Sequence, residues 1–337
     1  MQGDQPVQQV PQGGLYQDIG DGPPRRKSGW RVFFTVILVL SVLANIVLFL
    51  MVVGLAVFLG AGRGDALTEE VIRSGPRHTK IAVVRLEGVI NNETADEVYK
   101  QLEKARKDER VKGIILRINS PGGTISGSDA IYHQIRDRTD KPVVAFMQGV
   151  AASGGYYSSV ACDKIVAEPT AITGSIGVIG GWFVIRELLE EKLGIEPFIV
   201  KSGRRKDWPS AFHKPSEEEQ AYVHKKLIGP AYARFVKIVA EGRKSVLDAN
   251  SVKALADGSI YTAGEALEKK LIDDIGYLDD AIEQAKRLAN IEQAQVVEYR
   301  RPFSLSSLLR SEAATRIDRD LLYELCAPQV LYLWTGP

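Results

Sequence analysis

A serine set among small residues is the first candidate for chemistry in this sequence. Ser153 lies in the stretch GVAASGGYY, between an apolar segment and the start of a predicted helix. A side chain at such a turn is open to a reactant, and its small neighbours let a substrate backbone come close. The N–H of Gly154 is placed to stabilise an oxyanion, because such a donor must point there before the charge develops. The alternative interpretation is a strand–helix junction that needs glycine only for its geometry.

A second glycine-rich loop, NSPGG at residues 119–123, follows the preceding predicted strand. The carboxyl ends of neighbouring parallel strands meet at one edge of a sheet, so we expect the two loops to lie close together. Consecutive glycines can expose N–H groups to a cleft, and Gly123 is the candidate for the other oxyanion donor. A phosphate loop is the rival interpretation, but the segment matches neither GxGxxG nor GxxxxGKS/T.

The serine hydroxyl needs a base to act as a nucleophile. None of the histidines lies in a glycine-rich or strand-end setting; they are His78, His133, His213 and His224. The remaining basic candidates lie in KSGRRKD at residues 201–207. A lysine acts as a base only where burial or a cationic neighbour lowers its pKa from about 10.4. Composition alone favours a solvated basic loop, and it does not choose between Lys201 and Lys206.

The elements that must position these residues alternate between strand and helix after residue 80. Apolar runs predict strands at 80–90, 111–118, 142–147, 164–167, 176–179, 196–200 and 296–299. Helical spacing and a capping signal predict helices at 94–108, 126–138, 182–193, 216–242, 262–269 and 279–288. Such alternation makes a parallel sheet with right-handed crossovers the expected arrangement, and thus an α/β fold.

The N-terminal region has the composition of a tail followed by a membrane span. Residues 1–24 are rich in Gln, Gly, Pro and Asp, which predicts disorder. The uncharged stretch 32–62 is longer than the roughly 20 residues of a bilayer helix and than the apolar region of a cleaved signal peptide. We therefore expect a retained transmembrane helix at 32–60. Four basic residues precede it, which places residues 1–31 in the cytoplasm and residues 63–337 outside the inner membrane.

Charge and cysteine content exclude several classes of function. Lys+Arg 43 against Asp+Glu 42 gives no electrostatic reason to expect a nucleic-acid partner. The cysteines and histidines show no CxxC or HxxxH spacing, so we expect no metal and no cofactor. Cys162 and Cys326 are interpreted as two separate thiols, because nothing in the sequence requires them to pair.

Four blocks together carry a resemblance to a known family. NSPGG, GVAASGGYY, ITGSIGVIGG at 172–181 and KSGRRKD occur in the order found in the signal peptide peptidase A family, in its short, single-unit form. The resemblance covers about residues 80–300. It implies a ClpP/crotonase-like fold of repeated ββα units, and a membrane-anchored protease with a Ser/Lys dyad.

The matching motifs assign roles to individual residues. Ser153 corresponds to the nucleophile, and Lys206, not Lys201, to the base. Ser175 corresponds to the serine that orients the lysine amine, and Gly123 and Gly154 to the oxyanion donors. Two arginines before the lysine are more basic than the family pattern, and residues 208–213 diverge from it, which leaves substrate preference open.

The resemblance also implies substrates and assembly. Remnant signal peptides and other unfolded hydrophobic peptides would be cleaved inside a homo-oligomer, whose enclosed sites exclude folded proteins. The base can come from the same subunit or from a neighbour. Domain organisation is expected as a linker at 61–79, a protease domain at 80–300 and a C-terminal segment at 301–337 with no assigned role.

Three other interpretations remain beside the Ser/Lys protease. An acyl-CoA hydratase or isomerase shares the oxyanion-loop geometry, but it uses glutamates and has no reason to face the cell exterior. A membrane scaffold with an inactive protease fold requires loss of Ser153 or Lys206, and both are present. A protease that acts on membrane proteins together with a partner fits the same anchor.

Overall fold

The computed structural model describes residues 29–61, 67–301 and 329–336. The chain divides into two units, Met1–Gly60 and Ala61–Pro337. The whole tail predicted to be disordered, part of the predicted linker and most of the predicted C-terminal segment lie outside the described residues.

The first unit contains one long helix, α1 (Gly29–Ala61). Its stretch Gly29–Leu55, 27 residues long, contains a window of 18 residues with a mean hydropathy of 3.1. At about 1.5 Å of rise per residue, such a helix is longer than the roughly 30 Å hydrocarbon core of a bilayer. The predicted span at 32–60 falls inside this helix, which is long and apolar enough to cross a membrane.

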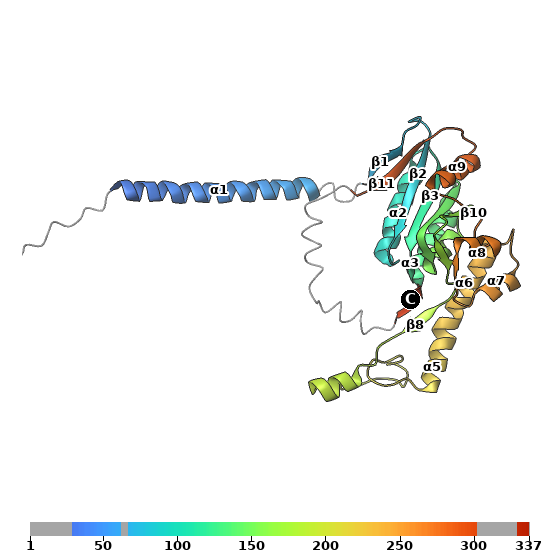
Figure 1. The fold of residues 1–337 in the computed structure, drawn as a ribbon. Coiled ribbons are helices and arrows are strands. Elements are labelled where there is room, and N and C mark those ends of the chain that lie inside the picture. Colours follow the sequence, from blue (N-terminus) through green and yellow to red (C-terminus); the bar gives the residue numbers. More distant parts are fainter. Residues whose placement is uncertain (1–28, 62–66, 302–328, 337) are drawn as a thin grey trace, which may run out of the picture. The chain divides into compact units, whose positions relative to one another are not determined.

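The second unit is built on a nine-stranded mixed sheet (Figure 1). Its main path runs in the order β1 (Thr68–Arg73), β11 (Gln295–Arg300), β2 (Lys80–Glu87), β3 (Val111–Ser120), β5 (Val143–Ala152), β6 (Lys164–Ala167) and β10 (Asp274–Ile275). Along this path only β1 pairs antiparallel with its neighbour. Two short strands extend the sheet beside the end of β5, namely β7 (Ile172–Gly174) and β9 (Ile260–Thr262). The predicted α/β fold with parallel central strands is confirmed.

Helices cover both faces of the sheet, because side chains of its central strands are apolar on both sides. On β2, Ala82 and Val84 join the core beneath α2 (Asn92–Lys107) and α3 (Ile125–Arg138). The alternate residues Ile81 and Val83 join a second core beneath α9 (Leu278–Leu288). The side chains of Asn91 and Thr124 cap the first turns of α2 and α3, which fixes where these two helices begin.

A short second sheet lies at the carboxyl edge of the first. The strand order is β4 (Gly122–Thr124), β12 (Gln329–Leu333) and β8 (Ile179–Gly181), and both pairings are antiparallel. The succession β3, β4 and α3 forms one ββα unit, in which the first strand belongs to the large sheet and the second to the small one. Figure 1 marks the end of the described chain beside β8.

The rest of the second unit is mainly helical. The predicted helix at 216–242 is confirmed as the continuous run α5 (Glu217–Val223), η2 (His224–Ile228) and α6 (Gly229–Gly242). Its cap is the predicted serine, because Ser216 Oγ accepts a hydrogen bond from the Glu219 N–H at 3.2 Å. Shorter helices are α4 (Gly154–Ser159), α7 (Ala249–Leu255) and α8 (Ala263–Glu268).

Three of the sequence-based element assignments are wrong. The strand predicted at 176–179 begins only at its last residue, as β8, because Gly174 and Ser175 have φ angles of +85° and +50° that end the preceding strand β7. No strand forms at 196–200, where the chain has no sheet edge to pair with and the apolar side chains are exposed. The predicted helix at 182–193 begins only at residue 186 and is largely the π-helical turn η1 (Leu188–Lys192).

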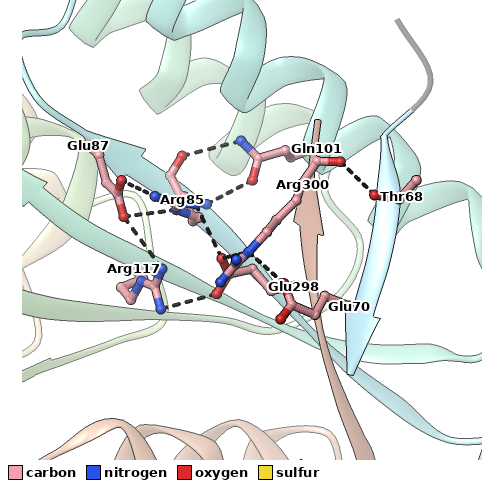
Figure 2. Close-up of polar contacts among 8 residues, drawn as sticks. All are labelled: Thr68, Glu70, Arg85, Glu87, Gln101, Arg117, Glu298 and Arg300. Carbon is pink, nitrogen blue, oxygen red and sulfur yellow. Dashed lines mark hydrogen bonds and ion pairs between the residues drawn. The ribbon is translucent and has the colours of Figure 1, made fainter. Parts of the chain in front are cut away.

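A buried carboxylate connects three neighbouring strands of the sheet (Figure 2). Glu298 on β11 is 1 % exposed and pairs with Arg85 at 3.4 Å and Arg117 at 3.2 Å. Arg300 also reaches the Glu298 carboxylate at 3.2 Å. An unpaired buried charge is far costlier than a paired one, so this network holds β2, β3 and β11 in one register.

Candidate active site

Ser153 lies at the junction between β5 and α4 in a strained backbone conformation. Its φ and ψ are 53° and −113°, a region that side-chain-bearing residues seldom adopt. The Ser153 N–H donates to the Gly174 carbonyl at 2.8 Å, and its carbonyl accepts from the Tyr157 N–H at 2.8 Å. Two neighbouring elements therefore fix the turn. Strain of this kind, on the order of 1–3 kcal/mol, persists mainly at functional sites.

The strand that leads to Ser153 bends before it reaches the turn. The first half of β5 pairs with β3 and β6, and its last three residues pair with β7. The bend is at Gly149, whose φ is +65° and whose N–H donates to Glu168 Oε1 at 2.8 Å. The end of β5 thus lies between Ser120 of β3 and the short strand β7, and Ser153 follows directly after it.

The two glycine-rich loops meet at Ser153, as expected from their strand ends. A Cβ built on Gly122 would lie 2.6 Å from the Gly154 nitrogen and 3.1 Å from Ser153 Cβ. A Cβ built on Gly154 would lie 3.2 Å from the Gly123 nitrogen and 2.3 Å from Ser128 Oγ. Only glycine fits at either position. The structure thus brings Gly123 and Gly154 together beside the serine.

Ser175 lies on the same cavity as Ser153. The cavity has a volume of about 380 Å³, and its lining includes both serines and residues 177–179. Ser175 has a φ of +50°, and its N–H donates to the Ser259 carbonyl at 2.7 Å. Like Ser153, it is held at a strained turn that faces the cavity.

Lys206 is not brought to this cavity. It does not belong to the lining of the cavity that contains Ser153 and Ser175, and its side chain is exposed. Around it, Lys201 pairs with Asp207 at 2.9 Å. Both adjacent arginines pair with Glu218, and they hold the pKa of that carboxyl below its usual value. Figure 1 shows the yellow-green segment that leads to this loop lying apart from the sheet. Its role as the base remains a prediction.

Strand β12 lies in the site beside the glycine loops. It pairs antiparallel with β4 on one side and with β8 on the other, and Tyr332 is opposite Gly123. The Tyr332 carbonyl oxygen lies only 2.1 Å from the position of a Cβ built on Gly122, next to the Gly154 nitrogen. The following residues, Leu333 and Trp334, line the cavity of Ser153. An extended peptide therefore crosses the candidate site with a carbonyl at the glycine loops.

The side chain of Tyr332 fills an aromatic pocket behind this carbonyl. It is fully buried, and its ring stacks on Tyr157 with centroids 5.1 Å apart and planes 25° apart. The Phe235 ring also packs on it, with the two ring centroids 4.7 Å apart. The Tyr332 hydroxyl donates to the Ala231 carbonyl at 2.8 Å. The pocket is thus shaped for a large aromatic side chain and offers an acceptor at its end.

Sequence reasoning missed β12 and this pocket. The segment QVLYL is rich in β-branched and aromatic residues, which is a signal for a strand. Its pairing partners, however, are more than 140 residues away in sequence, at β4 and β8. A local pattern can indicate such a strand but cannot say which edge it joins.

The one cysteine that the structure describes, Cys162, plays no part in the site. Cys162 is buried, and burial raises the pKa of its thiol well above the usual range. A thiol must ionise to react, so this side chain packs as a small apolar group. Cys326 lies outside the described residues, and the prediction of two separate thiols stays untested.

The sequence of this chain is similar to those of known peptidases. The family model described as peptidase family S49 matches residues 135–292, and the Clp protease model matches residues 69–171. A protein of Enterococcus faecium, provisionally named signal peptide peptidase SppA, is 41 % identical over 70 % of this chain and 71 % of its own length. Protease 4 of Haemophilus influenzae is 35 % identical over 65 % of this chain, but only 36 % of its own length is covered. The solved structure of a ClpP1 variant from Listeria monocytogenes aligns at a TM-score of 0.41 and 20 % identity, over 59 % of this chain and 94 % of its own.

The fold and the site define a serine peptidase with a ClpP-like α/β architecture. The chain belongs to peptidase family S49. The resemblance to signal peptide peptidase A that the four sequence blocks carry is thereby confirmed.

Proposed function

We propose that this protein is a membrane-anchored endopeptidase that uses Ser153 and Lys206 to cleave remnant signal peptides and other unfolded hydrophobic peptides. The observation that carries the proposal is the position of β12. An extended segment pairs with β4 and β8, as a substrate strand would, and its Tyr332 carbonyl lies beside Ser153 and the Gly154 nitrogen. Recognition through main-chain hydrogen bonds suits unfolded peptides, because only an extended chain can add a strand.

The proposed chemistry is acyl transfer. Neutral Lys206 takes the proton of Ser153 Oγ, which attacks the scissile carbonyl and forms an ester as the peptide C–N bond breaks. The N–H groups of Gly123 and Gly154 hold the oxyanion, and Ser175 orients the lysine amine. The lysine then protonates the leaving amine, and water hydrolyses the ester. The strained turn at Ser153 and the contact between the two glycine loops support these roles.

We further propose that Lys206 reaches Ser153 of a neighbouring copy. Within one chain the lysine is exposed and outside the cavity, while the segment before it presents unpaired apolar surface. The exposed side chains of this segment are Phe183, Leu188, Leu193, Ile195, Phe198 and Val200. Large apolar side chains that are exposed together on one segment mark an interaction site. A second copy of the chain would cover it and complete the dyad.

The membrane arrangement belongs to the same proposal. Helix α1 would be a retained anchor, with residues 1–31 in the cytoplasm and the peptidase domain at 80–300 outside the inner membrane. The length and hydropathy of Gly29–Leu55 support a span, and the preceding basic residues support the orientation. Signal peptides left in the bilayer after secretion would then lie on the same membrane as the enzyme.

Removing β12 is expected to activate the enzyme toward short peptides. A tethered segment competes at an effective concentration of about 1 mM, so a chain that ends at residue 328 should show kcat/KM raised about tenfold or more. The comparison uses full-length and shortened protein in the same detergent with one fluorogenic peptide. Tyr332→Phe, which keeps the ring and loses only the hydroxyl bond to Ala231, serves as the matched control and should change the rate little. An unchanged rate in the shortened chain would mean that β12 does not occupy the substrate groove.

The substrate class is tested by comparing the cleavage of three kinds of substrate. Purified full-length protein is incubated with a free signal peptide, a denatured protein and the same protein folded, and products are read by mass spectrometry. We expect the signal peptide and the denatured chain to be cut and the folded protein to stay intact, because a folded chain offers no free strand. Cleavage of the folded protein at a similar rate would contradict the proposal.

A further inference from the structure

A polar network stands behind the aromatic pocket and holds one of its walls. Tyr157 on α4 forms that wall, is fully buried, and stacks on the Tyr332 ring. Its hydroxyl donates to Asp129 Oδ1 at 2.5 Å. Asp129 lies on α3, so the bond connects the helix that begins at the nucleophile with the crossover helix beside it.

A third helix fixes the carboxylate. Arg234 on α6 donates to the same Asp129 oxygen from Nε at 2.9 Å and from a terminal nitrogen at 2.6 Å. His133 lies next in the network, with its Nε2 3.2 Å from Arg234 and its Nδ1 2.5 Å from Asp137. These outer groups reach solvent, since the Arg234 and His133 side chains are 43 % and 50 % exposed.

The hydrogen bonds of this network keep the Tyr157 ring in one orientation. Burial and the bond to Asp129 hold the pKa of Tyr157 well above its ordinary value, so its hydroxyl remains a donor. Arg234 has a raised pKa because of Asp129, and it remains charged. A hydrogen bond to a charged acceptor is about twice as strong as a neutral one. The ring of Tyr157 is therefore held by its hydroxyl in the plane that stacks on an aromatic guest.

We propose that Asp129 is a positioning residue that sets the preference of this peptidase for an aromatic side chain on the acyl side of the cleaved bond. It holds Tyr157 in the stacking orientation, and Arg234 holds Asp129. The inference rests on the proposed function, because it takes Tyr332 as the stand-in for the substrate residue. Asp129 touches neither substrate nor Ser153 in this arrangement and acts only through Tyr157.

The test compares two peptides that differ only in that residue, tyrosine or leucine, with full-length protein in detergent. For Asp129→Asn we expect the ratio of kcat/KM for tyrosine over leucine to fall about tenfold, the size expected for a lost aromatic stacking pair. The ratio cancels any occupancy by β12, which competes equally with both peptides. Asp129→Glu should restore most of the ratio, and Asp137→Asn, which changes only the outer end of the network, should leave it unchanged.

A double-mutant cycle adds a second readout. Tyr157→Phe in the Asp129→Asn background should lower the ratio no further, because both changes remove one interaction. Equal slowing of both peptides with an unchanged ratio would show a merely structural role and overturn the inference. A wild-type enzyme that cleaves both peptides without preference would also overturn it, while leaving the proposed function standing. A wild-type protein that cleaves neither peptide would instead overturn the proposed function, and the inference with it.

Discussion

Replacing Ser153 with alanine is expected to lower kcat for peptide hydrolysis by about 10⁴–10⁶-fold, the range seen when a serine nucleophile is removed. The reason is local: the 380 Å³ cavity is lined by two serines, and only Ser153 stands beside the two glycine loops. Hydrolysis of a fluorogenic peptide by the full-length variant measures the loss. The variant should keep its far-ultraviolet circular dichroism, because the bonds that hold the turn come from the backbone.

Two serine controls make this result specific. Ser202→Ala removes an exposed hydroxyl in the loop before Lys206 and should leave the rate unchanged. Ser175→Ala should retain more activity than Ser153→Ala, since its proposed role is to orient the base. Full activity in Ser153→Ala would show that Ser153 is not the nucleophile, whatever the other variants do.

The second large effect is expected at Lys206. A nucleophile and its base act as one unit, so Lys206→Ala should approach the loss of Ser153→Ala, at least about 10⁴-fold. The chain offers a matched control in the same loop. Lys201 carries the same charge and pairs with Asp207 at 2.9 Å, and Lys201→Ala should keep the rate within about threefold, because exposed ion pairs contribute little.

The lysine pair separates a catalytic amine from a general effect of charge. Both variants lose one cation from the same exposed loop, so a loss confined to position 206 supports a base there. Equal losses in Lys201→Ala and Lys206→Ala would show that the loop acts through its charge or its packing. A fully active Lys206→Ala would exclude the predicted dyad.

Much of the fold could be predicted because its signals are local. The apolar runs of β2, β3 and β5 and the capped helix that begins after Ser216 depend on neighbours within a few residues. The edge of the sheet where the two glycine loops meet follows from the parallel crossovers. This is why Gly123, Gly154 and Ser153 were brought together in the structure as the sequence had indicated.

The errors occur where partners are distant. The segment 196–200 has the composition of a strand, but no sheet edge lies beside it, and Phe198 remains exposed. Strand β12 depends on β4 and β8, which no local pattern connects to it. The aromatic pocket is assembled from α4 and α6 around a side chain near the end of the sequence, Tyr332. The pocket therefore depends on tertiary contacts that local sequence patterns do not reveal.

The position of Lys206 relative to Ser153 could not be predicted for a different reason. The motif that selects it says nothing about which chain receives its amine. Among the residues that the structure describes, Lys206 is exposed and no basic side chain lines the cavity of Ser153. We therefore propose that the nucleophile and the base of one site come from two copies of the chain.

Co-expression of full-length Ser153→Ala and Lys206→Ala tests that claim most directly. In a closed ring with random mixing, a site is complete only when an intact Ser153 meets an intact Lys206 from its neighbour, which is the case for about a quarter of the sites. We predict that the co-assembled protein regains about a quarter of wild-type peptide hydrolysis, although each variant alone is inactive. Activity that stays at the level of the single variants, in assemblies shown to contain both chains, would contradict the shared site.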